Sequence, residues 1–410
     1  MKLHKLGALA AVSILAFAAC SNSSASTAPD TGLGKVEIPA NEPVHIAYWG
    51  VLSGADASLG EDSKQGVQIA VDDIGEFMGH KIQLTTEDGL CTPEGGATAA
   101  TKLAADSTLV GLVGSACSDE VVGGIKTITE AGLTTISPSN TRPALTADDR
   151  DATYAGYART AHNDKLQGKV AAEFAYNELG LRKAATIHDG SGYAEALAGV
   201  FAENFKALGG EIVAAEAIAK GTTDMSTTLK TMAAAKPDLI YMPLFIAEAG
   251  FLQSQIPSTT GLEKVVTIGA DGHYSSDFLK AAGASAVGHY QTSPNFSAFT
   301  GDYAGFLEKR KAAFGGDPLS AFHAQAYDAT QILFAALAKA TTKNADGSLT
   351  VDKKALRDAV FATKDYAGLT GTLSCTPTGD CGAPVIAVYQ ITQADVDALK
   401  MPSTPIFPKN

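Results

Sequence analysis

Residues 109–141 read LVGLVGSACSDEVVGGIKTITEAGLTTISPSNT, and this stretch predicts a strand, a helix and a second strand in succession. Leu109–Val113 and Leu133–Ile136 are short apolar runs, the pattern of strands that are buried on both faces of a sheet. Asp119–Thr129 lies between them and is predicted to be helical. Strands joined through a helix run parallel, because the helix carries the chain back to the edge from which it started.

The same alternation continues on both sides of this stretch and restarts after Ala161. Upstream, the predicted elements are strand Val44–Trp49, helix Ser63–Phe77, strand Lys81–Thr86 and helix Gly95–Ala105. Downstream, they are helix Leu166–Leu179, strand Ala184–His188, helix Ala194–Leu208, strand Ile212–Ala217, helix Met225–Ala235, strand Leu239–Met242 and strand Val265–Ile268. A chain of 410 residues is too long for one hydrophobic core. The sequence therefore predicts an α/β fold with two doubly wound parallel-sheet lobes.

The last third of the chain has a different pattern. Helices are predicted at Asp302–Phe314 and Leu319–Thr341. Leu369–Ala383 is predicted to be a β-hairpin, whose turn at Thr376–Asp380 lies between two cysteines.

The N-terminus has the pattern of an export signal. Lys2 and Lys5 precede an uncharged run of small and apolar residues at Gly7–Ala19, which is too short to span a bilayer. The run ends in Phe-Ala-Ala-Cys at residues 17–20, which resembles a bacterial lipobox. We expect residues 1–19 to be a signal peptide and residues 20–42 a flexible linker anchored by lipid at Cys20, with ordinary signal cleavage as the alternative. The protein is then exported to the cell envelope, in the periplasm or on the outer cell surface.

The cysteine count fits an exported chain. If Cys20 carries lipid, four of the five cysteines remain, and an even set in an exported protein is typical of disulfides. Three pairings are open, of which Cys91 with Cys117 and Cys375 with Cys381 is the most local. The sequence has no CxxC motif and no Cys/His cluster, so we expect no metal site.

Composition and motifs argue against nucleic acid, cofactors and catalysis. The net charge of −13 comes without clustered Lys and Arg, so nucleic acid is not an expected partner. The glycine-bearing loops lack a complete dinucleotide or phosphate-binding signature, and we expect no cofactor. His188, Asp189 and Ser191 lie close together, but no Gly-x-Ser-x-Gly elbow follows a strand. We therefore expect no enzyme activity.

Polar and aromatic side chains follow several predicted strands, where parallel sheets bind ligands. Ser118 follows the first of the strands quoted above, and Tyr193, Phe245 and Asp271 follow strands of the second run. Hydroxyl groups could hold a carboxylate, and the acid could hold an ammonium group. For each residue alone, a helix cap, a packed aromatic ring or a turn is the simpler explanation. Their shared position at strand ends favours a site for a small zwitterion.

Seven stretches together resemble the periplasmic solute-binding proteins of the branched-chain amino-acid type, the Venus-flytrap receptors of ABC importers. The resemblance covers about residues 44–408. Its stretches are IAYWGVLSG at 46–54, GVQIAVDDI at 66–74, DGLC at 88–91, GSACS at 114–118, ISPSNTRPALT at 136–146, IHDGSGY at 187–193 and PDLIY at 237–241.

The resemblance implies two lobes of the periplasmic-binding-protein-like I fold, which close over a ligand. Three hinge crossings are expected near residues 161–163, 290–293 and 368–371. The expected lobes are residues 43–162 with 292–369, and residues 163–291 with 370–410.

The resemblance also implies a ligand set and a role for the protein. Ser118, which follows a disulfide-bonded Cys117, would hold the amino-acid carboxylate with Thr141, assisted by the main chain at Ser139. Tyr193 would line the cleft and Asp271 would bind the ammonium group. The family's disulfide matches Cys91–Cys117, whereas a pair like Cys375–Cys381 occurs only in some members. The expected partners are a small-molecule ligand, the permease subunits of an ABC importer and the membrane through the anchor at Cys20, and the expected state is a monomer.

The departures from the family pattern concern the ligand's side chain. Leu59 stands where leucine binders have a cleft tyrosine, and Phe245 occupies another aromatic position. Trp49, Asn140 and Arg142 are further candidates for shaping the pocket. A neutral or branched-chain α-amino acid is the expected ligand. The alternatives are an amide, urea, an aromatic acid or a nucleobase, or a ligand-sensing receptor on the same fold.

Overall fold

In the computed structural model, residues 32–383 and 385–408 are described, and they contain two large parallel sheets. The first sheet has the order β3–β4–β2–β5–β6–β7, in which only the β3–β4 pair is antiparallel among its described strands. The strands are β2 Val44–Gly50, β3 Glu76–Phe77, β4 His80–Asp88, β5 Leu109–Gly114, β6 Thr135–Ser137 and β7 Tyr157–Arg159. The strands predicted in this half are confirmed, with ends shifted by a residue or two.

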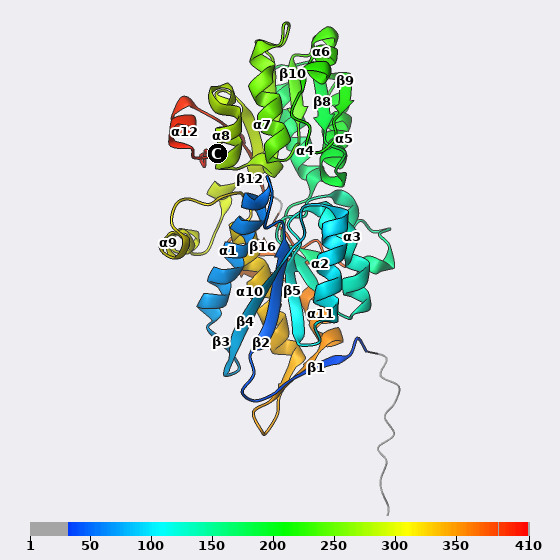
Figure 1. Ribbon diagram of the computed structural model, residues 1–410, viewed down its shortest axis with the longest axis vertical. Helices are drawn as coiled ribbons and strands as arrows, with labels where there is room; N and C mark the ends of the chain where they lie inside the picture. The colour runs from blue at the N-terminus through cyan, green and yellow to red at the C-terminus, as the bar shows by residue number, and fades with distance from the viewer. Residues whose placement is uncertain (1–31, 384, 409–410) are drawn as a thin grey trace, which may run out of the picture. The chain divides into compact units, whose positions relative to one another are not determined.

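Helices cover both faces of the first sheet (Figure 1). Tyr48 of β2 packs into the core on one face, with residues of α1 and α10, and Trp49 packs into the core on the other, with residues of α2 and α3. Neighbouring residues separate in this way because successive strand side chains point to opposite faces. The helices of this lobe are α1 Ala57–Ile74, α2 Pro93–Ala105, α3 Ser118–Glu130, α9 Tyr303–Phe314, α10 His323–Ala340 and α11 Lys353–Phe361.

The second sheet has the order β17–β12–β11–β10–β8–β9, in which β17 pairs antiparallel with β12 and the other pairs are parallel. Its strands are β8 Lys183–His188, β9 Glu211–Ala217, β10 Leu239–Met242, β11 Val266–Gly269, β12 Tyr290–Pro294 and β17 Ile386–Gln390. The helices around it are α4 Asp164–Glu173, α5 Gly192–Ala207, α6 Ser226–Ala235, α7 Ile246–Gln255, α8 Ser276–Ala282 and α12 Gln393–Ala398. Sequence and structure agree on the α/β fold with two parallel-sheet lobes.

Three predicted helices have different ends in the structure. The helix expected at Ser63–Phe77 is α1 Ala57–Ile74, and Phe77 lies in β3. The helix expected at Leu166–Leu179 is α-helical only over α4, and Phe174–Glu178 continues it as a π-helix. The helix expected from Leu319 begins at His323 as α10.

The chain crosses between the lobes later than predicted at two of three places. Between β7 and α4 it leaves the first sheet near residues 160–163, as expected. β12 still belongs to the second sheet, so the second crossing follows Pro294 instead of preceding residue 292. The third crossing lies between Cys381, which is buried in a first-lobe core, and β17 of the second sheet. The boundary at residue 370 is therefore wrong, because residues 370–381 still pack on the first lobe.

The hairpin near the third crossing also differs from its prediction. β15 Tyr366–Gly368 pairs with β16 Gly371–Leu373, so the turn lies at residues 369–370. The segment predicted to be the turn is a loop closed by the disulfide between Cys375 and Cys381. A hairpin is therefore present, but it is shorter and lies earlier in the chain than predicted, and the disulfide closes the loop that follows it.

The predicted linker is partly wrong. β1 Lys35–Ile38 pairs antiparallel with β14 Leu349–Asp352, which also pairs with β13 Thr341–Lys343. Val36 and Ile38 are buried in a first-lobe core. The burial of Val36 and Ile38 fixes β1 to the first lobe, although the polar composition of residues 21–42 predicted a flexible linker there. The predicted signal peptide, Cys20 and the start of the linker lie outside the described residues.

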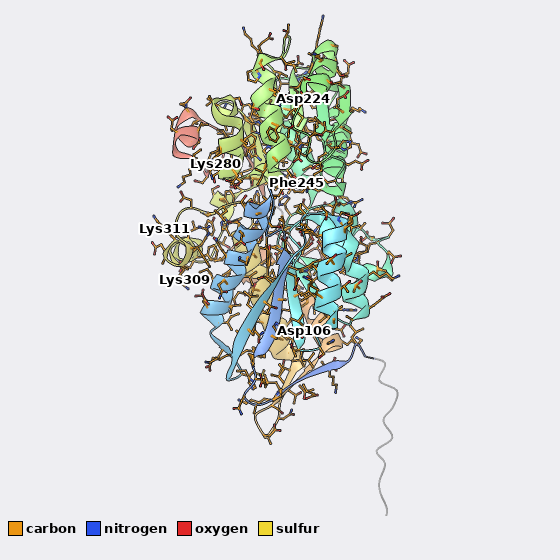
Figure 2. The ribbon with its side chains drawn as sticks, viewed as in Figure 1. Asp106, Asp224, Phe245, Lys280, Lys309 and Lys311 are labelled. Atoms are coloured by element: carbon orange, nitrogen blue, oxygen red, sulfur yellow. A yellow bond between two sulfur atoms is a disulfide. The ribbon has the colours of Figure 1, made fainter. Side chains whose placement is uncertain are left out.

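None of the helices formed by residues 32–383 and 385–408 has the length and apolar character that a membrane crossing requires. Lys280, Lys309 and Lys311 are exposed, whereas Phe245 is buried and lies where the two lobes meet (Figure 2).

Candidate ligand-binding site

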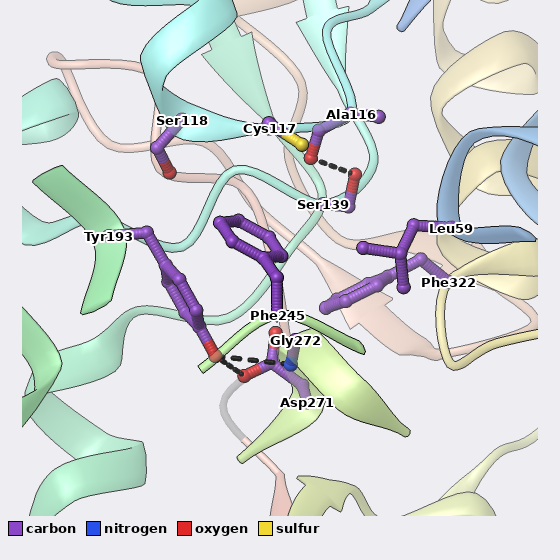
Figure 3. Close-up of a pocket in the computed structure, with 10 residues that line it drawn as sticks. All are labelled: Leu59, Ala116, Cys117, Ser118, Ser139, Tyr193, Phe245, Asp271, Gly272 and Phe322. Carbon is purple, nitrogen blue, oxygen red and sulfur yellow. Dashed lines mark hydrogen bonds between the residues drawn. The ribbon is translucent and has the colours of Figure 1, made fainter. Parts of the chain in front are cut away.

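The carboxyl ends of strands from both sheets meet at a cavity between the lobes. The cavity encloses about 320 Å³ of space, including solvent at its mouth. Figure 3 shows its lining residues, which are Leu59, Ala116, Cys117, Ser118, Ser139, Tyr193, Phe245, Asp271, Gly272 and Phe322. Six of the eight predicted ligand-binding residues are in this set, namely Leu59, Ser118, Ser139, Tyr193, Phe245 and Asp271.

The first lobe contributes the loops that follow β5 and β6, which are hydrogen-bonded to each other. Ser118 begins α3, directly after Cys117, and its hydroxyl accepts a hydrogen bond from the Arg142 N–H at 3.4 Å. The Ser139 hydroxyl follows β6 and donates to the Ala116 carbonyl at 2.8 Å. Hydroxyl groups and the first N–H groups of a helix are suited to an anionic group such as a carboxylate.

Glu120 holds the loop before Ser118 in place. Its buried carboxylate accepts from the N–H groups of Cys91, Ala116 and Cys117 at 2.9, 3.0 and 2.9 Å. Burial raises the pKa of Glu120 to about 7, although these three hydrogen bonds act in the opposite direction. Cys91 and Cys117 are also joined by a disulfide. The pairing that the family resemblance implied is therefore present, and it fixes the wall that carries Ser118.

The second lobe contributes a hydrogen-bonded acid. The Tyr193 hydroxyl donates to Asp271 Oδ1 at 3.0 Å and accepts from the Gly272 N–H at 3.1 Å (Figure 3). Gln167 of α4 donates through Nε2 to the same Asp271 oxygen at 2.7 Å. Asp271 is 2% exposed. A carboxylate held from two sides at the floor of a cavity is fixed in position for a cationic group.

A second buried acid, Asp164, lies beside Asp271. Three atoms that could bind a cation, a ring nitrogen of His162 and one carboxylate oxygen each of Asp164 and Asp271, lie within 4.8 Å of one another. Asp164 Oδ2 accepts from the Thr141 hydroxyl at 3.1 Å, whereas its Oδ1 atom is buried and has no hydrogen-bond partner. His162 Nε2 is 2.6 Å from Gln167 Oε1, and its Nδ1 atom is likewise unpartnered.

Burial governs the charges of this acid pair. It raises the pKa of Asp271 and of Asp164, and the Asp271 charge raises the pKa of Asp164 further. Burial lowers the pKa of His162, whereas the charge of His162 lowers the pKa of Asp271 and so acts against the burial of that acid. Two close carboxyl groups with an unpartnered oxygen are suited to a cation, either an ammonium group or a metal ion.

The remaining wall of the cavity is apolar. Leu59, Phe245 and Phe322 are buried and line it together. The Phe245 ring lies 5.3 Å from the Tyr193 ring between centroids. Phe322 precedes α10, and its N–H donates to Asp62 Oδ2 at 3.2 Å. These three side chains could contact an apolar group of a ligand, and none of them carries a charge.

Two predicted ligand-binding residues lie elsewhere. The prediction for Trp49 is wrong, because its side chain packs in the first-lobe core and its Nε1 donates to the Thr135 hydroxyl at 3.1 Å. Thr141 is buried and is not among the cavity-lining residues, because its hydroxyl is bound to Asp164. Of the further candidates, Asn140 is fully buried and Arg142 is half-buried outside the lining set.

Sequence reasoning missed Phe322, Asp164 and Gln167. Phe322 was placed inside a predicted helix. Asp164 and Gln167 begin α4, where acidic and amide residues are ordinary helix-start residues. The position of Asp164 and Gln167 just after a hinge crossing was the available signal. It does not show that Gln167 binds Asp271, which is 104 residues away in the sequence.

Comparisons with known proteins agree with this fold. The periplasmic binding protein family model matches residues 43–396. The Leu/Ile/Val-binding protein homolog 3 of Brucella melitensis is 26% identical over 344 residues, which cover 83% of this chain and 89% of that protein.

Solved structures of similar proteins have the same fold. The branched-chain amino acid transporter substrate binding protein LivJ of Streptococcus pneumoniae, in complex with isoleucine, has a TM-score of 0.73 at 26% identity, covering 86% of this chain and 97% of that chain. A solute binding protein from R. palustris in complex with benzoate has a TM-score of 0.73 at 21% identity, covering 86% of this chain and 94% of that chain, and this likeness concerns the fold alone. The match over residues 43–396, on a fold of two parallel-sheet lobes around a cleft, shows that the chain belongs to the periplasmic binding protein family, a family of extracytoplasmic solute-binding proteins that are not enzymes.

Proposed function

We propose that this protein captures a small neutral α-amino acid with an apolar side chain and delivers it to an ABC importer, without chemical change. The observation that carries the proposal is the buried carboxyl group of Asp271, which lines the cavity and has a second buried acid, Asp164, within 4.8 Å of it. Two carboxylates removed from water are costly unless a cation compensates them. An α-ammonium group is a cation of the right size that also brings a carboxylate and a side chain.

The two ends of the zwitterion have separate partners. The ammonium group binds Asp271, and the neighbouring carboxyl group of Asp164, which is outside the lining set, adds negative charge within 4.8 Å of Asp271. The carboxylate binds the Ser118 hydroxyl and the first N–H groups of α3, with main-chain groups near Ser139. Thr141 acts indirectly, since its hydroxyl orients Asp164.

The apolar wall selects the side chain. Leu59, Phe245 and Phe322 offer contact area without hydrogen-bonding groups. A polar or charged side chain would lose its water there without replacement, at a cost of about 1–3 kcal/mol for a neutral polar group. Contact with these three buried apolar side chains favours branched-chain and other compact apolar amino acids.

The relatives support the role in transport. Several of those that match are named as Leu/Ile/Val-binding proteins, and one solved relative is a transporter substrate binding protein in complex with isoleucine. We extend this role to the present chain, with the permease subunits of an importer as partners and a monomer as the working state. Export through residues 1–19 and a lipid anchor at Cys20 belong to the same proposal.

The test is a thermal-shift screen of residues 21–410, refolded to remove any co-purified molecule. L-leucine is compared with 2-hydroxy-4-methylpentanoate, in which a hydroxyl replaces the ammonium group, and with 3-methylbutylamine, which lacks the carboxylate. At a thousandfold its Kd a compound adds about 4 kcal/mol of stability. We expect stabilisation by L-leucine alone, unchanged by EDTA. Equal stabilisation by the hydroxy acid would contradict the ammonium site, and loss of binding in EDTA would assign the acid pair to a metal ion.

An aromatic-acid ligand is the second candidate, because a protein of the same fold binds benzoate. Benzoate therefore belongs in the panel. Stabilisation by benzoate with silence from every amino acid would favour this candidate. The buried acid pair speaks against it, since an aromatic acid carries no cation to compensate Asp164 and Asp271.

A further inference from the structure

Two carboxylates of the first lobe reach across the cleft to the N-termini of two helices of the second lobe. Asp119 Oδ1 and Oδ2 both accept from the Gly192 N–H, each at 3.1 Å, and Gly192 is the first residue of α5. Asp56 Oδ1 accepts from the N–H of Ile246, the first residue of α7, at 3.2 Å. In both contacts a carboxylate meets unpaired N–H groups and the positive end of a helix dipole.

Lys220 strengthens the second of these contacts. This second-lobe residue lies just after β9, and its Nζ is 3.4 Å from Asp56 Oδ2. The same ammonium group donates to the Cys91 carbonyl at 3.2 Å. Lys220 therefore binds two first-lobe groups at once. The Asp56 side chain is 6% exposed, so its bonds are screened little by solvent.

Neither carboxylate is among the residues that line the cavity. Asp119 precedes Glu120 on α3, and Asp56 directly precedes α1 without a side-chain hydrogen bond to that helix. Each of their bonds joins residues of different lobes, so opening the cleft separates the partners. The bonds made by Asp119 and Asp56 therefore act on the lobes and not directly on a captured molecule.

We propose that Asp119 and Asp56 are positioning residues that stabilise the closed arrangement of the lobes and thereby raise the affinity of the cleft. The inference rests on the proposed function, because closure matters to a protein that captures a molecule between its lobes. Loss of one charge-assisted hydrogen-bond pair shifts a two-state equilibrium by about tenfold. Asp119→Ala should therefore raise the Kd for L-leucine about tenfold.

The direct measurement is the distance between the lobes without added amino acid. Nitroxide labels are attached at Lys126→Cys on α3 and Lys206→Cys on α5, both of which are exposed positions. Double electron–electron resonance then gives the distribution of distances. We expect Asp119→Ala and Asp56→Ala to move the distribution toward longer distances.

Two variants control for a merely structural effect. Asp352→Ala removes a carboxylate that caps α11 of its own lobe, by accepting from the Ala355 N–H at 2.9 Å, and should leave the distances unchanged. Asp119→Asn keeps an oxygen that accepts from Gly192 and should restore most of the closed population. Circular dichroism verifies that each variant is folded.

An unchanged distance distribution in both alanine variants would overturn the inference, and so would an equal shift in Asp352→Ala. The affinity for L-leucine is measured separately by calorimetry. Failure of L-leucine to bind any variant, including the parent, would refute the proposed ligand while leaving the distance result intact. The two proposals therefore fail in distinguishable ways.

Discussion

Replacement of Asp271 by asparagine isolates the charge that we assign to ammonium binding. The asparagine oxygen can still accept from Tyr193 and Gln167, which now donate at 3.0 and 2.7 Å. An ammonium group about 4 Å from the carboxylate gains about 4 kcal/mol at an effective dielectric constant of about 20. Asp164 remains and compensates part of the loss. We therefore expect the affinity to fall by about 3 kcal/mol, or about two orders of magnitude in Kd.

Isothermal titration calorimetry with L-leucine measures this change. Asp328→Asn is a matched control, because Asp328 is also a buried acid that accepts two backbone N–H bonds, from Leu369 and Thr370, and it does not line the cavity. Its substitution should lower stability and leave the Kd within about twofold. If Asp271→Asn binds L-leucine within about threefold of the parent, the assignment of Asp271 to the ammonium group is refuted.

Three further predictions follow from the same geometry. Burial raises the pKa of Asp164 and Asp271, and an ammonium group binds their ionised forms. The affinity for L-leucine should therefore fall as pH drops through the raised pKa values, and a Kd that stays constant down to the pH at which the protein unfolds would contradict this. Replacing Cys91 and Cys117 by alanine opens a disulfide between residues 26 apart and should lower the free energy of unfolding by about 3 kcal/mol in urea titrations, whereas a loss below about 1 kcal/mol would show that Glu120 alone holds the loop. Phe322→Ala removes a ring from the cavity wall and leaves space for a larger side chain. The Kd for L-phenylalanine should therefore fall relative to the Kd for L-leucine, and an unchanged ratio of the two would exclude Phe322 from ligand contact.

Local patterns in the sequence were sufficient for most of the fold. Leu109–Gly114 is buried along its whole length, and a continuous apolar run of this kind is recognisable without knowledge of its neighbours. Tyr193, Phe245 and Asp271 could be singled out because the carboxyl ends of parallel strands meet at one edge. Trp49 was misplaced because it is the second-last residue of β2, and the sequence does not tell that its side chain still packs on a covered face of the sheet instead of at the strand end beside the cleft.

The predicted lobe boundaries were wrong at the second and third crossings between the lobes. Residues 370–381 stay in the first lobe, which the chain enters after β12, and only β17 returns to the second sheet. The path depends on which core accepts Leu373 and Cys381, and both cores accept apolar residues equally well. Composition therefore could not locate the third crossing.

The sequence alone determined the two lobes, the order of most strands and helices, and the strand ends that carry ligand-facing residues, because each of these depends on neighbouring residues along the chain. Tertiary structure alone decided the acid pair of Asp164 and Asp271, the hydrogen bond that joins Asp271 to Gln167 across 104 residues, and the position of Phe322, which Asp62 fixes from 260 residues away. Such contacts follow from how two lobes and their crossings pack in space. Hydrogen bonding and burial act between atoms that are close in space, and local sequence patterns do not record that closeness.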